Sequence, residues 1–455
     1  MNRTTHQRLR LFRAVFTAIA TAAATAAVIA TLIVAAPLSV RAELSPVEQR
    51  IAQHVDDHND EAIEFLERII NMNSGTMNLE GVRDVGRAFA PEFERLGFRT
   101  EWIDGSEFQR AGHLVATHKG QGPHILLIGH LDTVFEPDGP FQTYELLSGN
   151  RARGPGIADM KGGDVIIVQA LAALHAADVL DPLTITVILI GDEEKAGRPV
   201  SVARTALIDA AQKADIAIAF ENGDNDPATA VISRRGSSKW RITVTGTPAH
   251  SSQIFRDDIG AGAVYEASRI LHRFYTELAG EPYLTFNPGL ILGGTYVDHD
   301  TAGTRGTAFG KNNVIAEHTV ASGDLRTLYP EQLADAKERM RAIVADHLPG
   351  TSATITFHDS YPPLAPSDGN YRLLKILSRV SVDLGMGEMG AVDPSRAGAA
   401  DIAFTAGYVE MALDGLGLIG GDEHTENEWA DLTTLPTQTK RTALLLYRLS
   451  SWNAD

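Results

Sequence analysis

Gly129-His130-Leu131-Asp132-Thr133-Val134 is the stretch around which the rest of this 455-residue chain is organised. The four residues before it, 125–128, are all branched and aliphatic, which is typical of a strand buried on both faces in a parallel sheet flanked by helices. His130 and Asp132 are two positions apart, so in extended backbone both side chains point to the same side. The stretch therefore predicts a strand end where an imidazole and a carboxylate converge on one ligand. A satisfied histidine beside a solvated aspartate would explain the pair equally well if it stood alone.

Metal-ligating residue types also follow other strand-like runs, or lie in a loop that opens a long apolar helix. Together with His130, these residues are Asp159, Glu194, Glu221 and His424. In open α/β sheets, ligands gather at the carboxyl ends of the strands. Two histidines and three carboxylates can hold two divalent ions, with one carboxylate bridging them. Mixed nitrogen and oxygen ligands without sulfur favour Zn²⁺, with Co²⁺ or Mn²⁺ as alternatives.

Glu193 and Glu194 form the most informative acidic pair. Adjacent residues in extended backbone point to opposite sides, so one carboxylate can bind metal while the other faces a substrate. Asp192 adds a third acid, and three neighbouring carboxylates would repel one another strongly without a cation. Asp132 is interpreted as the acceptor for the free N–H of His130, which would set the tautomer of that ring.

The order of helix-like and strand-like segments predicts two architectures in one chain. Segments in 43–235 and again in 359–455 alternate between strand and helix, which indicates an α/β domain with a mostly parallel sheet flanked by helices. Between them, residues 236–358 follow the order β-α-β-β-α-β of a ferredoxin-like α+β domain. We therefore expect a catalytic domain in two parts, 43–235 and 359–455, with the domain 236–358 inserted between them.

The N-terminal segment 1–42 is typical of a secretory signal peptide. Arginines precede an uncharged apolar stretch from Ala14 to about Leu38, and small residues stand at the end of the segment, before Glu43. The apolar stretch is also long enough to be retained as a single membrane anchor, so cleavage and retention both remain open. In either case we expect an exported protein, periplasmic or secreted.

The overall composition excludes several classes of function. The chain has no cysteine, so it forms no disulfide and uses no thiolate chemistry. Its formal net charge is −18 at pH 7, which opposes binding of nucleic acid or anionic lipid through a general electrostatic field. We expect no nucleic-acid partner, and no membrane contact unless the N-terminal segment is retained. Any anionic substrate would need a local basic patch.

Several motifs together resemble the M20 metallopeptidases, a family that includes glutamate carboxypeptidases, aminoacylases and succinyl-diaminopimelate desuccinylases. The matching segments are GHLDTV at 129–134, GIADMKGG at 156–163, GDEE at 191–194, the strand end at Glu221 and HTE at 424–426. The resemblance extends from about residue 45 to 450. It implies a catalytic domain that binds two zinc ions and an inserted domain that commonly dimerises, so we expect a homodimer.

Position by position, the resemblance implies a role for each candidate residue. His130 and Glu221 would bind one zinc, Glu194 and His424 would bind the other, and Asp159 would bridge the two. Asp132 would orient His130, and Glu193 would be the general base. The resemblance also implies a cis peptide bond between Asp159 and Met160.

Three residues of the inserted domain also match the family. The segment 245–251 resembles the one whose histidine, here His250, reaches an active site, often that of the partner subunit, and stabilises the oxyanion. Asn313 and Arg326 resemble the pair that holds the substrate's carboxylate, and arginine suits this role through bidentate hydrogen bonding.

The chain also departs from the family pattern. The segment 398–401 reads Gly-Ala-Ala-Asp where the family often has Gly-Gly-Ser/Thr-Asp. Glutamate-releasing members carry a lysine soon after the glutamate ligand, whereas here none occurs between Glu221 and Lys239. Arg234 or Arg235 could substitute, so specificity for glutamate remains open.

These observations predict an exported dizinc hydrolase that cleaves an amide or peptide bond next to a C-terminal amino acid. Its substrate would be a small peptide or an N-acyl amino acid. An N-acyl-amino-acid deacylase is the nearest alternative. A catalytically inactive relative that serves in binding is a third, which Glu193 argues against because a binding protein does not need it.

Overall fold

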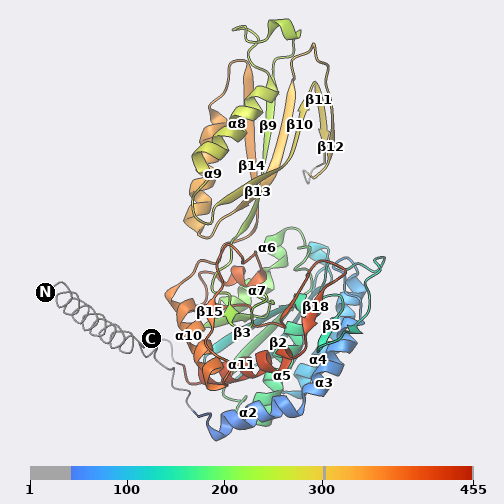
Figure 1. The fold of residues 1–455 in the computed structure, drawn as a ribbon, viewed down its shortest axis with the longest axis vertical. Helices are drawn as coiled ribbons and strands as arrows, with labels where there is room; N and C mark the ends of the chain where they lie inside the picture. The colour runs from blue at the N-terminus through green and yellow to red at the C-terminus, as the bar shows by residue number, and fades with distance from the viewer. Residues whose placement is uncertain (1–42, 301–303, 453–455) are drawn as a thin grey trace, which may run out of the picture. The chain divides into compact units, whose positions relative to one another are not determined.

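A computed structural model of the chain describes residues 43–300 and 304–452, so the expected signal segment 1–42 lies outside the described residues. The predicted combination of a mostly parallel sheet flanked by helices with an α+β insert is confirmed (Figure 1). None of the described helices is both long and apolar enough to cross a membrane.

The central sheet has the strand order β1-β2-β6-β3-β7-β16. These strands are β1 (Arg99–Asp104), β2 (Gly112–His118), β3 (His124–His130), β6 (Thr184–Ile190), β7 (Ile216–Ala219) and β16 (Met411–Leu413). β3 runs parallel to both of its neighbours, β6 and β7, and β16 runs parallel to β7. β1 and β2 pair antiparallel at one side of the sheet. The parallel strands therefore end at one common edge, where His130 is the last residue of β3.

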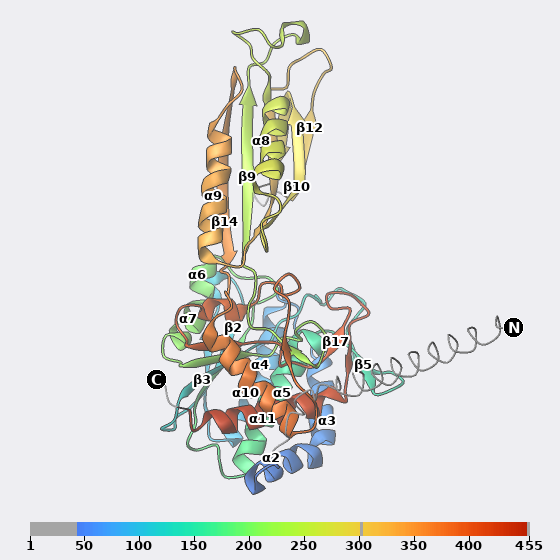
Figure 2. The ribbon, with the colours of Figure 1, turned by 60° about the vertical axis from the view of Figure 1, so that its left-hand side comes forward.

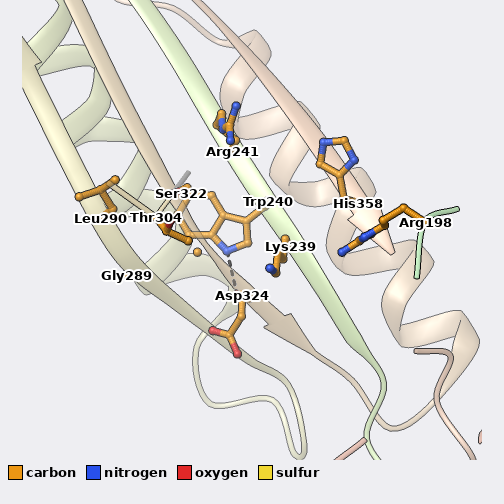
Figure 3. A pocket seen from close by; sticks show the side chains of 11 residues that line it. Arg198, Lys239, Trp240, Arg241, Gly289, Leu290, Thr304, Ser322, Asp324 and His358 are labelled. Atoms are coloured by element: carbon orange, nitrogen blue, oxygen red, sulfur yellow. Dashed lines mark hydrogen bonds between the residues drawn. The ribbon is translucent and has the colours of Figure 1, made fainter. Parts of the chain in front are cut away.

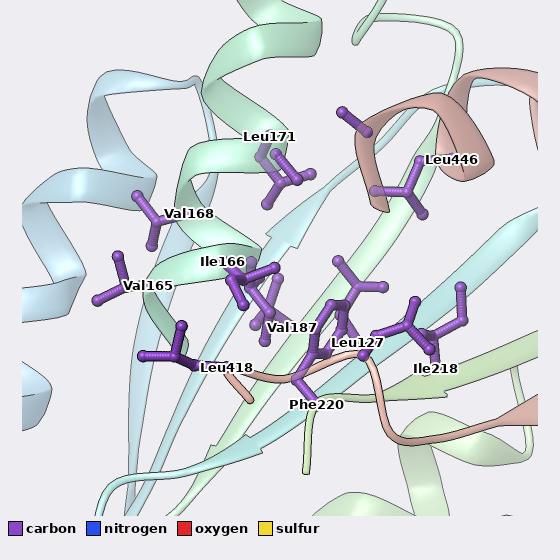
Figure 4. Close-up of a cluster of buried hydrophobic side chains, with 14 of the residues drawn as sticks. Leu127, Val165, Ile166, Val168, Leu171, Val187, Ile218, Phe220, Leu418 and Leu446 are labelled. Carbon is purple, nitrogen blue, oxygen red and sulfur yellow. The ribbon is translucent and has the colours of Figure 1, made fainter. Parts of the chain in front are cut away.

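Helices and short turns cover both faces of this sheet. The helices are α2 (Pro46–Asp57), α3 (Asn59–Ile70), α4 (Leu79–Arg95), α5 (Gly162–Ala176), α6 (Val200–Ala203), α7 (Thr205–Ala211), α10 (Asp368–Asp383) and α11 (Thr434–Leu449). Leu127 of β3 belongs to the same buried cluster as Ile166 of α5 and Leu446 of α11, as Figure 4 shows. Its neighbour Leu126 points the other way, into a second cluster with Leu207 of α7. Because both faces are buried, the strand requires an unbroken apolar run.

Two smaller sheets connect distant parts of the sequence. One has the order β17-β18-β5-β4, with β17 (Gly420–Gly421), β18 (Trp429–Asp431), β5 (Arg151–Arg153) and β4 (Glu145–Leu146). The other pairs β8 (Thr229–Ala230) with β15 (Gly390–Ala391). Pairing of β5 with β18 places the segment after β5, which contains Asp159, beside the loop before β18, which contains His424.

The insert forms an antiparallel sheet with the order β10-β13-β9-β14. Its elements are β9 (Ser237–Gly246), α8 (Ala263–Leu278), β10 (Thr285–Gly294), β13 (His318–Arg326), α9 (Pro330–Ala345) and β14 (Thr351–Tyr361). This is the predicted ferredoxin-like order, with an additional hairpin of β11 (Tyr296–His299) and β12 (Gly306–Phe309) that was not predicted. Helices α8 and α9 pack on one face of the sheet, over Trp240 and Ile242 (Figure 2). The domain boundaries at 235/236 and 358/359 remain predictions, and β14 continues to Tyr361.

Candidate metal centre

The five predicted metal ligands reach one site from five segments. His130 ends β3, Glu194 lies in the loop after β6, and Glu221 lies just after β7. Since these three strands are parallel neighbours, their carboxyl ends meet at the same edge. Asp159 comes from the short irregular turn η2 (Ile157–Lys161), where its peptide bond to Met160 is cis, as the resemblance implied. His424 comes from the loop between β17 and β18.

The carboxylate of Asp159 lies between two imidazole rings. Its Oδ1 atom is 3.1 Å from Nε2 of His130, and its Oδ2 atom is 3.0 Å from Nε2 of His424. Each of these two rings also faces a second carboxylate. Glu221 Oε1 is 3.7 Å from His130 Nε2, and Glu194 Oε2 is 3.1 Å from His424 Nε2. The site therefore consists of two donor sets, each with one imidazole and one glutamate, which share Asp159.

The same residues meet the chemical requirements of a divalent metal site. Donor atoms of His130, Asp159 and Glu194 all lie within 4.8 Å of one another. Burial raises the pKa of the Glu221 carboxyl well above its usual range, and the neighbouring charge of Asp159 raises it further, although His130 opposes this. Hydrogen bonds to Asp159 and Glu194 raise the pKa of His424 to about 11. This much buried negative charge is what a cation would neutralise, so the residues fit a metal.

Glu193 lies beside this cluster without joining either donor set. Together with His130 and Glu221 it lines an internal cavity of about 10 Å³, close to the size needed for one water molecule. Burial raises the pKa of the Glu193 carboxyl well above its usual range, and the charge of Asp401 adds to this effect. The two adjacent glutamates thus have different surroundings, since Glu194 lies 3.1 Å from His424 and Glu193 lines the cavity.

Asp132 holds the backbone of both glutamates, a role that the sequence did not reveal. Its Oδ1 accepts the main-chain N–H of Glu193 at 2.9 Å, and its Oδ2 accepts that of Glu194 at 3.2 Å. The hydroxyl of Thr76 donates to Oδ2 at 2.7 Å. His130 Nδ1 is 2.9 Å from the main-chain oxygen of Asp132 and 3.6 Å from its Oδ1. The nearer partner of His130 is therefore the carbonyl of Asp132 and not its carboxylate, which differs from the sequence interpretation.

A buried ionic network supports the loop that carries Glu193. Arg204 is fully buried and contacts Asp192 and Asp401, each at 2.6 Å. It also donates to the hydroxyl of Tyr361 at 2.9 Å, and that hydroxyl in turn donates to the main-chain oxygen of Glu193 at 3.1 Å. No sequence motif points to Arg204, because its partner Asp401 is 197 positions away in the chain. The indication available in the sequence was an arginine shortly after the acidic run 192–194.

A second buried pair supports Glu221. Arg234 Nε donates to Asp414 Oδ2 at 2.7 Å, and the main-chain N–H of Glu221 donates to Asp414 Oδ1 at 3.2 Å. Arg234 is buried and also donates to the main-chain oxygen of Gly398 at 3.0 Å. Arg235 donates to Thr285 Oγ1 at 3.2 Å and to the main-chain oxygen of Ser395 at 3.1 Å.

Glu428 is a further residue that sequence reasoning missed. Its fully buried carboxylate accepts three main-chain N–H groups of the Asp159 segment, from Gly156 at 3.2 Å, Ala158 at 2.9 Å and Asp159 at 3.2 Å. Glu428 follows His424 in the same loop. One side chain thus ties together the segments that supply the shared carboxylate and the second imidazole.

Of the three predicted residues of the insert, His250 and Asn313 lie next to each other, and Arg326 lies apart from them at the far end of β13. His250 is exposed, its Nδ1 is 2.9 Å from Ser252 Oγ, and it forms a β-bridge with Val314 beside Asn313. Arg326 ends β13 and contacts Asp324 at 3.2 Å. His250 and Asn313 flank the start of that nine-residue strand, so Arg326 lies about 26 Å further along it. Among residues 43–300 and 304–452, no hydrogen bond or ion pair joins these three residues to the metal-ligand cluster.

A mixed α/β fold in which two histidines and three carboxylates meet at the carboxyl edge of a mostly parallel sheet is typical of a metallopeptidase or a related amidohydrolase. The model of Peptidase family M20/M25/M40 matches residues 126–448, and the chain belongs to this family.

Named relatives agree with this assignment. Carboxypeptidase G2 of Pseudomonas sp. (strain RS-16) is 25% identical over 406 residues, which cover 88% of this chain and 92% of that protein. Acetylornithine deacetylase of Pasteurella multocida is 28% identical over 283 residues, covering 59% of this chain and 67% of the relative. The curated relatives therefore include both a carboxypeptidase and a deacylase.

Solved structures share the fold. Aminopeptidase PepT of Bacillus cereus superposes with a TM-score of 0.67 at 17% identity, covering 86% of this chain and 99% of the other. The YXEP protein of Bacillus subtilis, described as a dinuclear metal-binding peptidase of the M20 family, has a TM-score of 0.60 at 17% identity, with 86% and 98% covered.

Proposed function

We propose that this protein is an exported dizinc hydrolase that cleaves an amide or peptide bond next to a C-terminal amino acid. The observation that carries the proposal is the position of Asp159, whose two oxygens face two different imidazoles. A bridging carboxylate between two ions would have this arrangement. Membership of the family supports hydrolysis, and the relative named carboxypeptidase G2 supports release of a C-terminal residue.

The two donor sets assign the ligands of each ion. His130 and Glu221 would hold one zinc, His424 and Glu194 would hold the other, and Asp159 would bridge them. When bound, the metal pair supplies Lewis-acid polarisation of the scissile carbonyl and a lowered pKa for an attacking water. Nitrogen and oxygen donors without sulfur favour zinc, and Co²⁺ or Mn²⁺ share this preference.

Glu193 is the proposed general base. It lines the water-sized cavity beside His130 and Glu221, so its carboxylate can take a proton from a water held there. It would then pass this proton to the leaving amine. Asp132 is a positioning residue in this scheme, because its two oxygens hold the main chain of Glu193 and Glu194. The orientation of the base would therefore depend on Asp132 even though Asp132 contacts no substrate.

The positions of the insert residues favour an active site shared between two copies of the chain. His250 would stabilise the oxyanion, while Asn313 and Arg326 would hold the substrate's carboxylate. Asn313 and Arg326 lie near opposite ends of β13, so they cannot hold the same carboxylate from one copy. A homodimer in which His250 and Asn313 enter the partner's site would bring them together.

Exposed apolar side chains on the insert support the proposed dimer. β10 is an edge strand of the sheet, and edge strands can pair with a second copy. Large apolar side chains on β10, on the adjoining hairpin and at the start of α8 are exposed, namely Val264, Tyr265, Ile291, Tyr296 and Phe309. The other edge strand, β14, exposes polar threonine, serine and histidine side chains instead.

An N-acyl-amino-acid deacylase is the second candidate. It is favoured by the relatives named acetylornithine deacetylase and succinyl-diaminopimelate desuccinylase. Both candidates cleave an amide with the same residues, and they differ in the group on the acyl side of the bond. Export is proposed from the N-terminal segment 1–42 alone.

One experiment tests the function and separates the candidates. The zinc-loaded protein is incubated with matched sets of dipeptides and N-acetyl amino acids, and the released amino acids are identified by mass spectrometry. Release of C-terminal residues from peptides supports the carboxypeptidase, and release from the acetyl compounds alone supports the deacylase. Intact substrates in both sets, with two zinc ions bound per chain, would refute hydrolysis of either class.

A further inference from the structure

The open face of the insert sheet carries a cavity of about 600 Å³ (Figure 3). Helices α8 and α9 cover the opposite face, over Trp240 and Ile242. Because side chains alternate along a strand, Lys239 and Arg241 of β9 point to the open side. We call this cavity the basic trough; its lining includes Lys239, Arg241, Leu290, Ser322, Asp324 and His358.

Basic side chains predominate in the trough. Lys239 is the direct cross-strand neighbour of Asp324 on β13 and of His358 on β14. Arg198, from the loop that follows Glu194, lines the same cavity. The acidic member of the lining, Asp324, contacts Arg326 at 3.2 Å. Within residues 43–300 and 304–452, neither Lys239 nor His358 forms an ion pair. In a chain of net charge −18, this is the local basic patch that an anionic ligand requires.

The spacing of these basic groups matches an extended peptide. Lys239 and Arg241 are two residues apart on a strand, a separation of about 6.6 Å. An extended peptide has the same repeat, so acidic side chains at positions i and i+2 would face this lysine and this arginine. His358 lies one strand away from Lys239, about 5 Å across the sheet, and would extend the contact sideways.

We propose that the basic trough binds an extended peptide with acidic residues at alternate positions, and that such peptides are preferred substrates. The second half of the proposal rests on the proposed hydrolase function. The first half concerns binding alone and is independent of it.

Binding is tested with the full chain carrying Glu193→Gln, so that the probe is not consumed. The probes are the peptides acetyl-Glu-Ala-Glu-Ala and acetyl-Gln-Ala-Gln-Ala, titrated by calorimetry. The acidic probe should bind more tightly, and Lys239→Gln should weaken it about fivefold, the upper size of one exposed charge pair. Lys311→Gln, an exposed lysine of the insert outside the trough, should change nothing. Equal affinity for both probes, or equal losses in the two lysine variants, would overturn the proposal.

Charge reversal provides a second, independent measurement. Lys239→Glu should lose affinity for the acidic probe and gain affinity for acetyl-Lys-Ala-Lys-Ala, whereas simple damage to the sheet would weaken both. Full displacement of the acidic probe by an equal concentration of inorganic phosphate would show a small-anion site and would refute the assignment to a peptide.

Turnover separates this proposal from the proposed function. In the zinc-loaded protein with Glu193 intact, Lys239→Gln should raise KM for the acidic peptide without changing kcat. The KM for the neutral peptide should not change. Binding of the acidic probe without any peptide hydrolysis would refute the proposed hydrolase function and would still support peptide binding by the basic trough. Hydrolysis with no preference for the acidic peptide, either in binding or in KM, would refute peptide binding by the basic trough and would still support the proposed hydrolase function.

Discussion

The side chain of Glu428 accepts the main-chain N–H of Ala158 at 2.9 Å and so joins the loop that carries His424 to the segment that carries Asp159. It also accepts the N–H groups of Gly156 and Asp159. The two segments are more than 250 residues apart in the sequence, and pairing of β5 with β18 brings them together. The proposed bridging ligand and one terminal ligand therefore share a single support.

Replacing Glu428 by glutamine should weaken metal binding. The glutamine amide group would face main-chain N–H donors, so the Asp159 segment would lose part of its support. We expect an apparent zinc affinity lower by about 10- to 100-fold, the usual effect of removing a group that orients a ligand. Competition with a chromogenic chelator measures this. Glu426→Gln, an exposed acid of the same loop, is the matched control and should bind zinc as the unmodified chain does.

Replacing Glu193 by alanine should lower turnover strongly and leave the metal centre intact, because Glu193 belongs to neither donor set. We expect a loss of about a thousandfold in kcat, within the range of general acid–base contributions. Kinetics and elemental analysis on the same sample check both parts. Activity close to that of the unmodified chain would refute the mechanism.

The variants His424→Ala and Glu221→Ala should each lose one metal ion. Each substitution removes one donor of a different set, and the remaining donors are too few to hold that ion. Elemental analysis of the purified variants gives the stoichiometry. His250→Ala is the control and should retain both ions, since His250 lies on the insert. Two ions in both ligand variants would contradict the assignment.

Mixing two inactive variants tests the shared active site. In a heterodimer of His250→Ala and Glu193→Ala subunits, one site combines an intact base with an intact histidine. Random pairing should then restore at most about a quarter of the original activity. If subunit exchange is shown by differently tagged chains and no activity returns, His250 does not act across the interface. A fully active monomer in sedimentation would exclude sharing altogether.

The variant Arg204→Met should destabilise the fold strongly. It leaves the buried carboxylates of Asp192 and Asp401 without their common partner, and breaking a buried pair in this way costs about 3–5 kcal/mol. Urea denaturation monitored by circular dichroism measures the change. The control is Arg256→Met, which breaks an exposed pair with Asp258 and should cost about 1 kcal/mol or less. Equal effects of the two substitutions would show that the Arg204 network contributes little to stability.

The sequence alone determined the parts of this protein that are encoded locally. The apolar run before His130 specified a doubly buried strand, and repetition of this pattern specified the parallel sheet. Parallel strands place their carboxyl ends at one edge, so residues that follow them meet regardless of what separates them in the chain. For this reason His130, Glu194 and Glu221 could be grouped from sequence, and the order β-α-β-β-α-β identified the insert.

The contacts that support these groups became visible only in the folded chain. The supporting contacts of Arg204 with Asp401, Arg234 with Asp414 and Glu428 with Ala158 join residues more than 150 positions apart. Such partners have no fixed spacing, because any buried charge can be satisfied by whichever element packs against it. The same reason explains why Asp132 differs from the sequence interpretation. Its carboxylate accepts the main-chain N–H groups of Glu193 and Glu194, and its main-chain carbonyl is the nearer partner of His130. Local spacing determines which side a side chain faces, and packing between distant elements determines what it meets there.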